Sequence, residues 1–215
     1  PASLSGLEQS EFLLGVELLQ LDNHLTSSIA GTDNAGSTRS DSGVSVLPAV
    51  AVAFRPHDRR WSYGLGLFAV GGFGVNYPGD TANPILNPPF PTGAIYSKLS
   101  VLQMVPTAAY QVTDRLSIGF APTVSMIEVN LDPDLLHSPT QLGYPAATHS
   151  RTHWGLGFQA GIYYETDYAW RLGASYKSPQ WTEELTFYDS STVTDPRALR
   201  LNVDYPGIIS AGAAY

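Results

Sequence analysis

Residues 153–176 read HWGLGFQAGIYYETDYAWRLGASY, and this stretch decides the fold. Large apolar residues stand at every second position, and most of the residues between them are small or polar. The alternation restarts after Thr166-Asp167. A period of two predicts β-strands, here two long ones joined by a tight turn. Each run is longer than an ordinary strand and matches the roughly 9–11 residues that a tilted strand needs to cross a bilayer.

Aromatic residues gather beside this turn, namely Tyr163, Tyr164, Tyr168 and Trp170. Tyr and Trp favour the headgroup level of a membrane, where one end of the ring is apolar and the other is wet. Large apolar side chains on one face and Gly, Ser and Gln on the other are typical of a barrel with lipid outside and a polar lumen inside. In a soluble barrel or sandwich, the alternative interpretation, the exterior strand faces should instead be polar.

The bulk composition agrees with one large β domain. The 215 residues include only 14% charged residues, against a usual share of about 25%. The sequence contains no run of 18 apolar residues, so it predicts no transmembrane helix. The net charge of −8 argues against a nucleic-acid partner. Cysteine is absent from the sequence, so disulfides and thiolate metal sites are excluded.

About eight strands are expected along the chain, at roughly 11–19, 44–54, 61–69, 102–110, 116–131, 154–165, 168–176 and 201–215. We expect a bulge near Ile127-Glu128 and a phase slip near Ser178-Pro179. Short turns near 57–60, 113–114 and 166–167 alternate with longer loops near 30–43, 78–94, 132–150 and 189–197. This asymmetry predicts an all-β, antiparallel, up-and-down transmembrane barrel in the outer membrane, with the longer loops outside.

Several motifs together resemble the FadL-type outer-membrane transporters of long-chain fatty acids and other hydrophobic compounds. They are PASLSGL at 1–7, GLGLFAVGGFGVNY at 64–77, LSIGFAPTVSMIEVNL at 116–131, HWGLGFQAGIYYE at 153–165 and YAWRLGASYKSP at 168–179. The resemblance implies a fourteen-stranded barrel plugged by an N-terminal hatch. Residues 1–10 would be the end of the hatch and 11–215 about the first half of the barrel, monomeric when complete. The alternative is a complete eight-stranded barrel ending at Tyr215.

Gly72-Phe73-Gly74 is the expected lateral opening. In the family, this position is where the third strand is kinked inward and opens a hole in the wall. Glycines lower strand propensity and allow a ladder to break, and such a break in lipid must line a protected cavity. The alternative is an ordinary bulge.

Apolar residues in the long loops, and one lumen cation, are the candidate ligand contacts. The loop residues are Ile85, Leu86, Phe90, Leu135, Leu136, Leu142 and Tyr144. They could capture a hydrophobic ligand or pack the loops against each other. Lys177 faces the lumen by parity, as does Arg171, and could pair with a substrate carboxylate or form a salt bridge with Glu165 or Glu17.

The family's substrate-contacting basic residue has no match at 130–133, which read NLDP. The substrate class therefore stays open between fatty acids and aromatic or other hydrophobic compounds.

Catalytic and cofactor motifs are not found. His149 and His153 would lie about 13 Å apart on a strand, too far to share a metal ion. No nucleophile-elbow motif occurs. We therefore expect no enzyme and no cofactor, but passive uptake of a hydrophobic small molecule across outer-membrane lipid. The alternatives are a structural or adhesive barrel, whose loops bind a surface partner, and a membrane hydrolase with a Ser/His/acid cluster.

Overall fold

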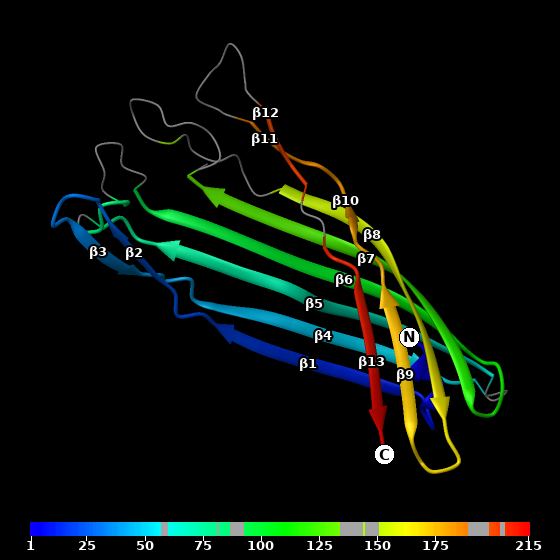
Figure 1. Cartoon of the computed structure of the whole chain (residues 1–215). Helices are drawn as coiled ribbons and strands as arrows, with labels where there is room; N and C mark the ends of the chain where they lie inside the picture. The colour runs from blue at the N-terminus through cyan, green and yellow to red at the C-terminus, as the bar shows by residue number, and fades with distance from the viewer. Residues whose placement is uncertain are drawn as a thin grey trace.

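One antiparallel sheet makes up most of the protein. The structure is a computed structural model and describes residues 1–56, 60–80, 82–86, 93–133, 144, 151–188, 198–202 and 205–215. Among these residues the sheet runs in the order β1-β4-β5-β6-β7-β8-β9-β13, with β10 also paired to β8 (Figure 1). Its strands are β1 (Glu11–Gln20), β4 (Val44–Phe54), β5 (Trp61–Tyr77), β6 (Ile95–Gln111), β7 (Leu116–Asp132), β8 (Arg151–Glu165), β9 (Arg171–Lys177), β10 (Trp181–Thr182) and β13 (Ile208–Ala214).

Short and long connections alternate, as expected for an up-and-down barrel wall. The connections β4–β5, β6–β7 and β8–β9 are short and lie together at one end of the sheet (Figure 1). At the opposite end, β2 (His24–Ser28) and β3 (Ala35–Arg39) form a hairpin in the long connection between β1 and β4. The all-β, antiparallel architecture with eight wall strands in sequence order is therefore confirmed.

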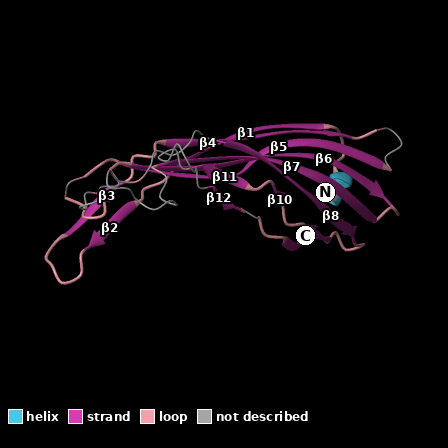
Figure 2. Ribbon diagram, turned by 90° about the horizontal axis from the view of Figure 1, so that it is seen from above, coloured by secondary structure: helices cyan, strands magenta, loops and turns pink. Residues whose placement is uncertain are grey.

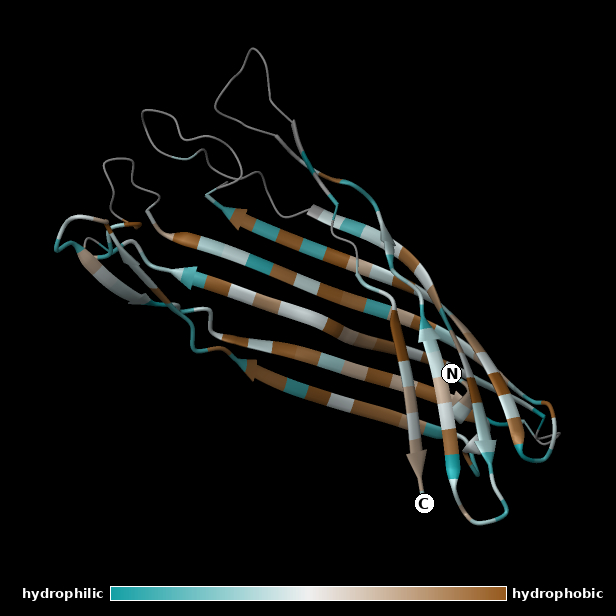
Figure 3. Ribbon diagram, in the orientation of Figure 1, coloured by the Kyte–Doolittle hydropathy of each residue, from teal (hydrophilic) through white to brown (hydrophobic). Residues whose placement is uncertain are grey.

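Apolar and polar residues alternate between the two faces of the sheet, and this alternation is seen as bands of colour along the strands in Figure 3. Ile118, Phe120, Leu156 and Leu172 are exposed on the outer face. Phe158 lies among them and packs against the rings of Phe120, Tyr176 and Trp181. An exposed face built of aliphatic and aromatic side chains suits contact with lipid. Within the described part of the chain, no helix is long and apolar enough to cross a membrane.

The inner face carries the N-terminal segment. The sheet curves around a short 3-10 helix, η1 (Ala2–Gly6), which contacts β5, β6, β7 and β8 (Figure 2). This close approach depends on a missing side chain, because a Cβ at Gly119 would overlap the backbone of Ala2. Ala2 and Ser5 are buried there. We call this inner face the lumen face.

The expected bulge at Ile127-Glu128 is wrong. β7 keeps one register with β8 from Leu116↔Tyr164 to Val129↔Arg151. The apparent slip has another cause, because Ile127 and Val129 stay on the lumen face and are buried there. The polarity of the two faces therefore reverses along β7, while its backbone remains regular.

Strand ends differ from the expectation at three places. β5 continues through the glycine cluster to Tyr77, and β6 begins at Ile95. Tyr168 was expected in a strand but lies in the β8–β9 turn. In this turn Thr166 N–H donates to Trp170 O at 2.9 Å, and Ala169 has a φ of 62°. The last wall strand begins only at Ile208, because β12 (Ala198–Leu201) pairs with β11 (Leu185–Tyr188) outside the main sheet.

Candidate lateral opening and lumen

The wall is interrupted between β4 and β5. Their ladder runs from Phe54↔Tyr63 to Ala49↔Phe68 and stops there. Beyond that point β4 continues to pair with β1, as far as Val44↔Gln20, and β5 continues to pair with β6, as far as Tyr77↔Ile95. Residues 42–48 and 69–75, all of them described, are not paired with each other. We call this interruption the β4–β5 gap.

The gap closes again at its outer end. Asp41 N–H donates to Asn76 O at 2.7 Å, and Asn76 N–H donates to Ser40 Oγ at 2.9 Å. The side-chain amide of Asn76 adds a bond to Asp41 O at 3.1 Å. The same number of residues separates the two junctions on each strand, from Ala49 to Asp41 and from Phe68 to Asn76. The strands therefore part and rejoin in one register, so the gap is a bounded window.

A bulge on β5 begins the separation. The register between β5 and β6 shifts between Ala69 and Gly71, which leaves Val70 as the extra residue. A bulge bends its strand and re-aims the residues that follow. Gly71 and Gly72 come directly after it and offer little resistance to such a bend. The alternation in the sequence stops at this bulge. The ladder that ends here is the one with β4, whereas Gly72, Phe73 and Gly74 stay paired to Ser100, Leu99 and Lys98 of β6.

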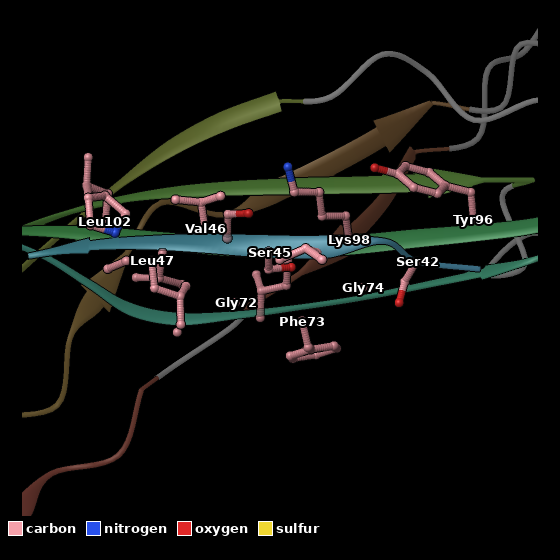
Figure 4. A pocket seen from close by; sticks show the side chains of 17 residues that line it. Ser42, Ser45, Val46, Leu47, Gly72, Phe73, Gly74, Tyr96, Lys98 and Leu102 are labelled. Atoms are coloured by element: carbon pink, nitrogen blue, oxygen red, sulfur yellow. The ribbon is translucent and has the colours of Figure 1, made fainter. Parts of the chain in front are cut away.

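β5 passes the gap on the lumen side of β4. Leu47 shares the lumen face of β4 with Ala49, whereas Gly72 pairs with Ser100 on the outer face. A Cβ at Gly72 would nevertheless lie 3.6 Å from Leu47 Cδ2. The inner face of one strand can meet the outer face of its neighbour only if the neighbour is displaced inward. Figure 4 shows β5 bowed away from β4, with Leu47 directed toward it and Phe73 on its far side.

A groove of about 420 Å³ occupies the gap. Leu47, Pro48 and Val46 line it from β4, and the glycines of β5 and Leu99 to Leu102 of β6 line the opposite side. Ser42, Ser45, Ser100 and Lys98 make parts of its lining polar. Unpaired backbone groups cost several kcal/mol each in hydrocarbon, so such a gap requires surroundings that protect it from lipid.

An apolar cluster lies on the lumen face beside the gap. Val101, Ile127, Val129 and Leu185 are buried together, and Leu99, Leu131 and Tyr205 pack against them. Phe73 pairs with Leu99 and therefore shares this face, where 56% of its surface is exposed. The lumen next to the gap is thus apolar, in contrast to the polar lumen that the sequence pattern predicted.

A polar cluster follows directly along the same strands. Gln180 Oε1 accepts hydrogen bonds from Thr123 Oγ1 at 2.8 Å, from Gln103 Nε2 at 3.1 Å and from Ser125 Oγ at 3.2 Å. Lys177 Nζ donates to Gln103 Oε1 at 2.9 Å. Along β6, the inward residues change from apolar Val101 to polar Gln103. The two clusters therefore meet at a sharp boundary.

The phase slip at Ser178-Pro179 brings Gln180 into this polar cluster. The partners on β8 change from Gln159↔Lys177 to Leu156↔Trp181, a shift of one residue. Ser178 N–H and Oγ bond to the backbone of Phe158, at 2.9 Å each. Arg171 is the other cation that the sequence pattern places on the lumen face. Its Nε lies 4.0 Å from Glu165 Oε1.

The outer end is held by a docked hairpin. Asn83 is fully buried and its Nδ2 donates to Leu25 O at 2.9 Å and to Thr38 Oγ1 at 3.1 Å. Ser27 Oγ donates to Asn83 Oδ1 at 2.5 Å. Thr38 Oγ1 donates to Asp80 Oδ2 at 2.8 Å. Asp80, residues 82–86 and the β2–β3 hairpin therefore form one unit beside the gap.

The loop residues expected to capture ligand are only partly described. Leu86 is buried in the docked unit and Ile85 is 45% exposed. Tyr144 is half-buried. Phe90, Leu135, Leu136 and Leu142 lie outside the described residues, as does His149. The described residues contain no group of three or more His, Cys, Asp or Glu suited to a metal ion.

Three functional candidates were not found from the sequence. They are Leu47, Asn83 and Gln180. Each lies close to or bonds with residues distant in the sequence, and in its own segment each resembles an ordinary strand or loop residue. A weak signal existed for Gln180, which follows Pro179 at the point where the alternation slips.

Long antiparallel strands, an apolar outer face and an asymmetric pair of ends define the chain as part of an outer-membrane β-barrel wall. The chain belongs to the family described as outer membrane protein transport protein (OMPP1/FadL/TodX), whose sequence profile matches residues 1–211. Comparison with curated protein sequences gives no match.

Solved structures of transporters share the fold. The toluene transporter TodX of Pseudomonas putida is 19% identical, with a TM-score of 0.73 over 99% of this chain and 60% of TodX. The toluene transporter TbuX of Ralstonia pickettii is 22% identical, with a TM-score of 0.67 over 99% of this chain and 60% of TbuX. A FadL homologue of Pseudomonas aeruginosa is 14% identical, with a TM-score of 0.60 over 87% and 47% of the two chains. This chain thus spans about 60% of the toluene transporters it matches.

Proposed function

We propose that this protein forms part of a passive outer-membrane channel for hydrophobic small molecules, which leave the lumen sideways through the β4–β5 gap. The observation that carries the proposal is the inward displacement of β5, which sets the glycine-lined outer face of that strand beside an apolar groove. An apolar molecule that moves from this groove into lipid avoids passage through water, where it is poorly soluble. Membership of the transport family supports the same function.

Gly72, Phe73 and Gly74 form the inner edge of the opening in this proposal. Capture by the outer loops, including Ile85 and Tyr144, would precede entry into the lumen. An adhesive barrel, the competing class, has no use for a wall that parts and rejoins beside an apolar groove. No energy source is needed, because the molecule moves down its own gradient.

The substrate class has two candidates. The similarity in fold to toluene transporters favours neutral monoaromatic compounds. The boundary between the apolar cluster and Lys177 favours an amphiphile, such as a long-chain fatty acid, whose chain would lie beside Val101 and whose carboxylate would meet the ammonium group.

The test is uptake of radiolabelled toluene and palmitate by cells that carry the full-length protein. Gly72→Val with Gly74→Val fills the groove opposite Leu47 and favours a paired strand, so uptake should fall sharply. Gly173→Val is the matched control, since the nearest atom to a Cβ there is 3.8 Å away and the site is far from the gap. Unchanged uptake of both compounds in a correctly inserted double variant would contradict lateral release.

A further inference from the structure

We propose that Leu47 is the gate of the β4–β5 gap and restricts it to thin apolar molecules, namely flat rings and unbranched chains, while globular hydrocarbons are excluded. This inference rests on the proposed lateral release and names the residue that sets its selectivity. The inference begins from one distance: a Cβ added at Gly72 would lie 3.6 Å from Leu47 Cδ2. At that point the side chain of Leu47 closes the slot between the two strands.

Leu47 is alone in this position. On the lumen face of β4, its neighbours along the gap are Ser45 and Ala49, both small. Across the gap, Gly71, Gly72 and Gly74 present no side chain. Among residues 42–48 and 69–75, which the structure describes in full, Leu47 is therefore the one large side chain that reaches from β4 toward β5 (Figure 4).

The two strands that frame the slot are each fixed on their far side. β4 is paired to β1 through Leu47↔Glu17 and its neighbours, and β5 is paired to β6 through Gly72↔Ser100. Moving either strand would break a ladder, whereas rotation of a half-buried leucine between staggered rotamers is fast. The width of the slot therefore changes through the Leu47 side chain.

The shape of the slot determines what can pass. Leu47 Cδ2 lies 3.6 Å from where a Cβ of Gly72 would be, which is an ordinary carbon–carbon contact of about 3.5–4.0 Å, so the side chain of Leu47 fills the slot. A rotamer change of Leu47 is therefore expected to free a layer about as thick as this one side chain. A benzene ring on its edge or a single alkyl chain fits a layer of this thickness. A cage hydrocarbon such as adamantane is thick in every direction and does not fit, although it is as apolar as toluene.

The experiment compares uptake of radiolabelled toluene and adamantane by cells that carry the full-length protein or one variant. Leu47→Ala should raise adamantane uptake relative to toluene about tenfold, the scale at which small changes of an apolar site discriminate substrates. Leu47→Phe should lower uptake of both compounds. Val50→Ala, on an outward-facing residue of β4 that pairs with Leu67 and does not line the groove, is the control and should leave the ratio unchanged. Correct insertion of each variant is checked by heat-modifiable migration.

Failure of the gate and failure of the proposed function give different results. If toluene uptake falls in the Gly72→Val and Gly74→Val double variant but Leu47→Ala leaves the ratio of the two compounds at the wild-type value, the gate is wrong and lateral release stands. If the wild-type protein transports none of toluene, adamantane and palmitate, both proposals fail. Equal transport of the two compounds by the wild-type protein also overturns the gate.

Discussion

Asn83 and Thr38 are 45 residues apart in sequence, yet Asn83 Nδ2 donates to Thr38 Oγ1 across 3.1 Å. The bond joins the loop after β5 to the β2–β3 hairpin and lies in a buried site. Loss of a buried partner leaves polar groups unsatisfied, which costs about 1–3 kcal/mol. These two residues therefore fix the hairpin beside the outer end of the gap.

Asn83→Ala should release the hairpin without opening the wall. We expect amide hydrogen exchange to speed up across residues 24–39 and to remain slow in β6 and β7. Thr26→Ala is the matched control, because it removes only the exposed bond to Ser37 Oγ within the same hairpin. Equal exchange rates in the Asn83 and Thr26 variants would show that Asn83 does not hold the hairpin.

Docking of the hairpin should weaken in acid. The hydrogen bond from the Ala82 amide, and then that from the Thr38 hydroxyl, lower the pKa of Asp80 below its usual value of 3.8. Of the two bonds, that from Thr38 joins Asp80 to the hairpin, and through it docking favours the carboxylate. This contribution is fully present above pH 3.8 and is lost as pH falls through the lower pKa of the docked state. Faster exchange in residues 24–39 is expected in that range, and Asp80→Asn should remove the pH dependence. A wild-type exchange pattern that does not change with pH would contradict this.

Gly157 should be essential for the polar cluster in the lumen. A Cβ at this position would overlap the side-chain amide of Gln180. Gly157→Val therefore displaces the amide and leaves Thr123, Ser125 and Gln103 without their shared acceptor, at a cost of about 1–3 kcal/mol for each unsatisfied group. A lower urea midpoint of unfolding is expected than for Gly173→Val, which has room for its side chain. Equal midpoints would mean that the cluster adds nothing to stability.

Lys177 separates the two substrate classes. Lys177→Met keeps the long side chain and removes the charge. If the substrate is an acid, palmitate uptake should fall about tenfold or more, because hydrogen bonds to charged groups contribute about 1.5–3 kcal/mol, whereas toluene uptake should not change. Arg171→Met, on the same face but next to Glu165, is the control. A parallel loss of both uptakes would assign Lys177 a structural role through Gln103.

The sequence was sufficient where one rule decides the outcome. Side-chain alternation placed the eight wall strands, because lipid on one face leaves little choice of register. It failed in β7 at Ile127, where the two faces exchange polarity and the pattern resembles a backbone slip. The glycines at 71–74 indicated an irregularity, but only the fold shows that β4 is the partner that β5 loses.

The side chains that complete the site could not be predicted for a related reason. Leu47 becomes important through a glycine on another strand, and Gln180 through the missing side chain of Gly157. Such pairs are created by the fold, and neither member is distinctive in its own segment.

The equal spacing of the two junctions around the gap has a mechanical consequence. Since Ala49 to Asp41 and Phe68 to Asn76 contain the same number of residues, the ladder could be completed across the gap without either strand sliding along the other. Only the bulge at Val70 would have to be absorbed. The parting of the two strands therefore shifts neither the pair Ala49 and Phe68 nor the pair Asp41 and Asn76 along the strands, so the interruption is confined to the stretch between them.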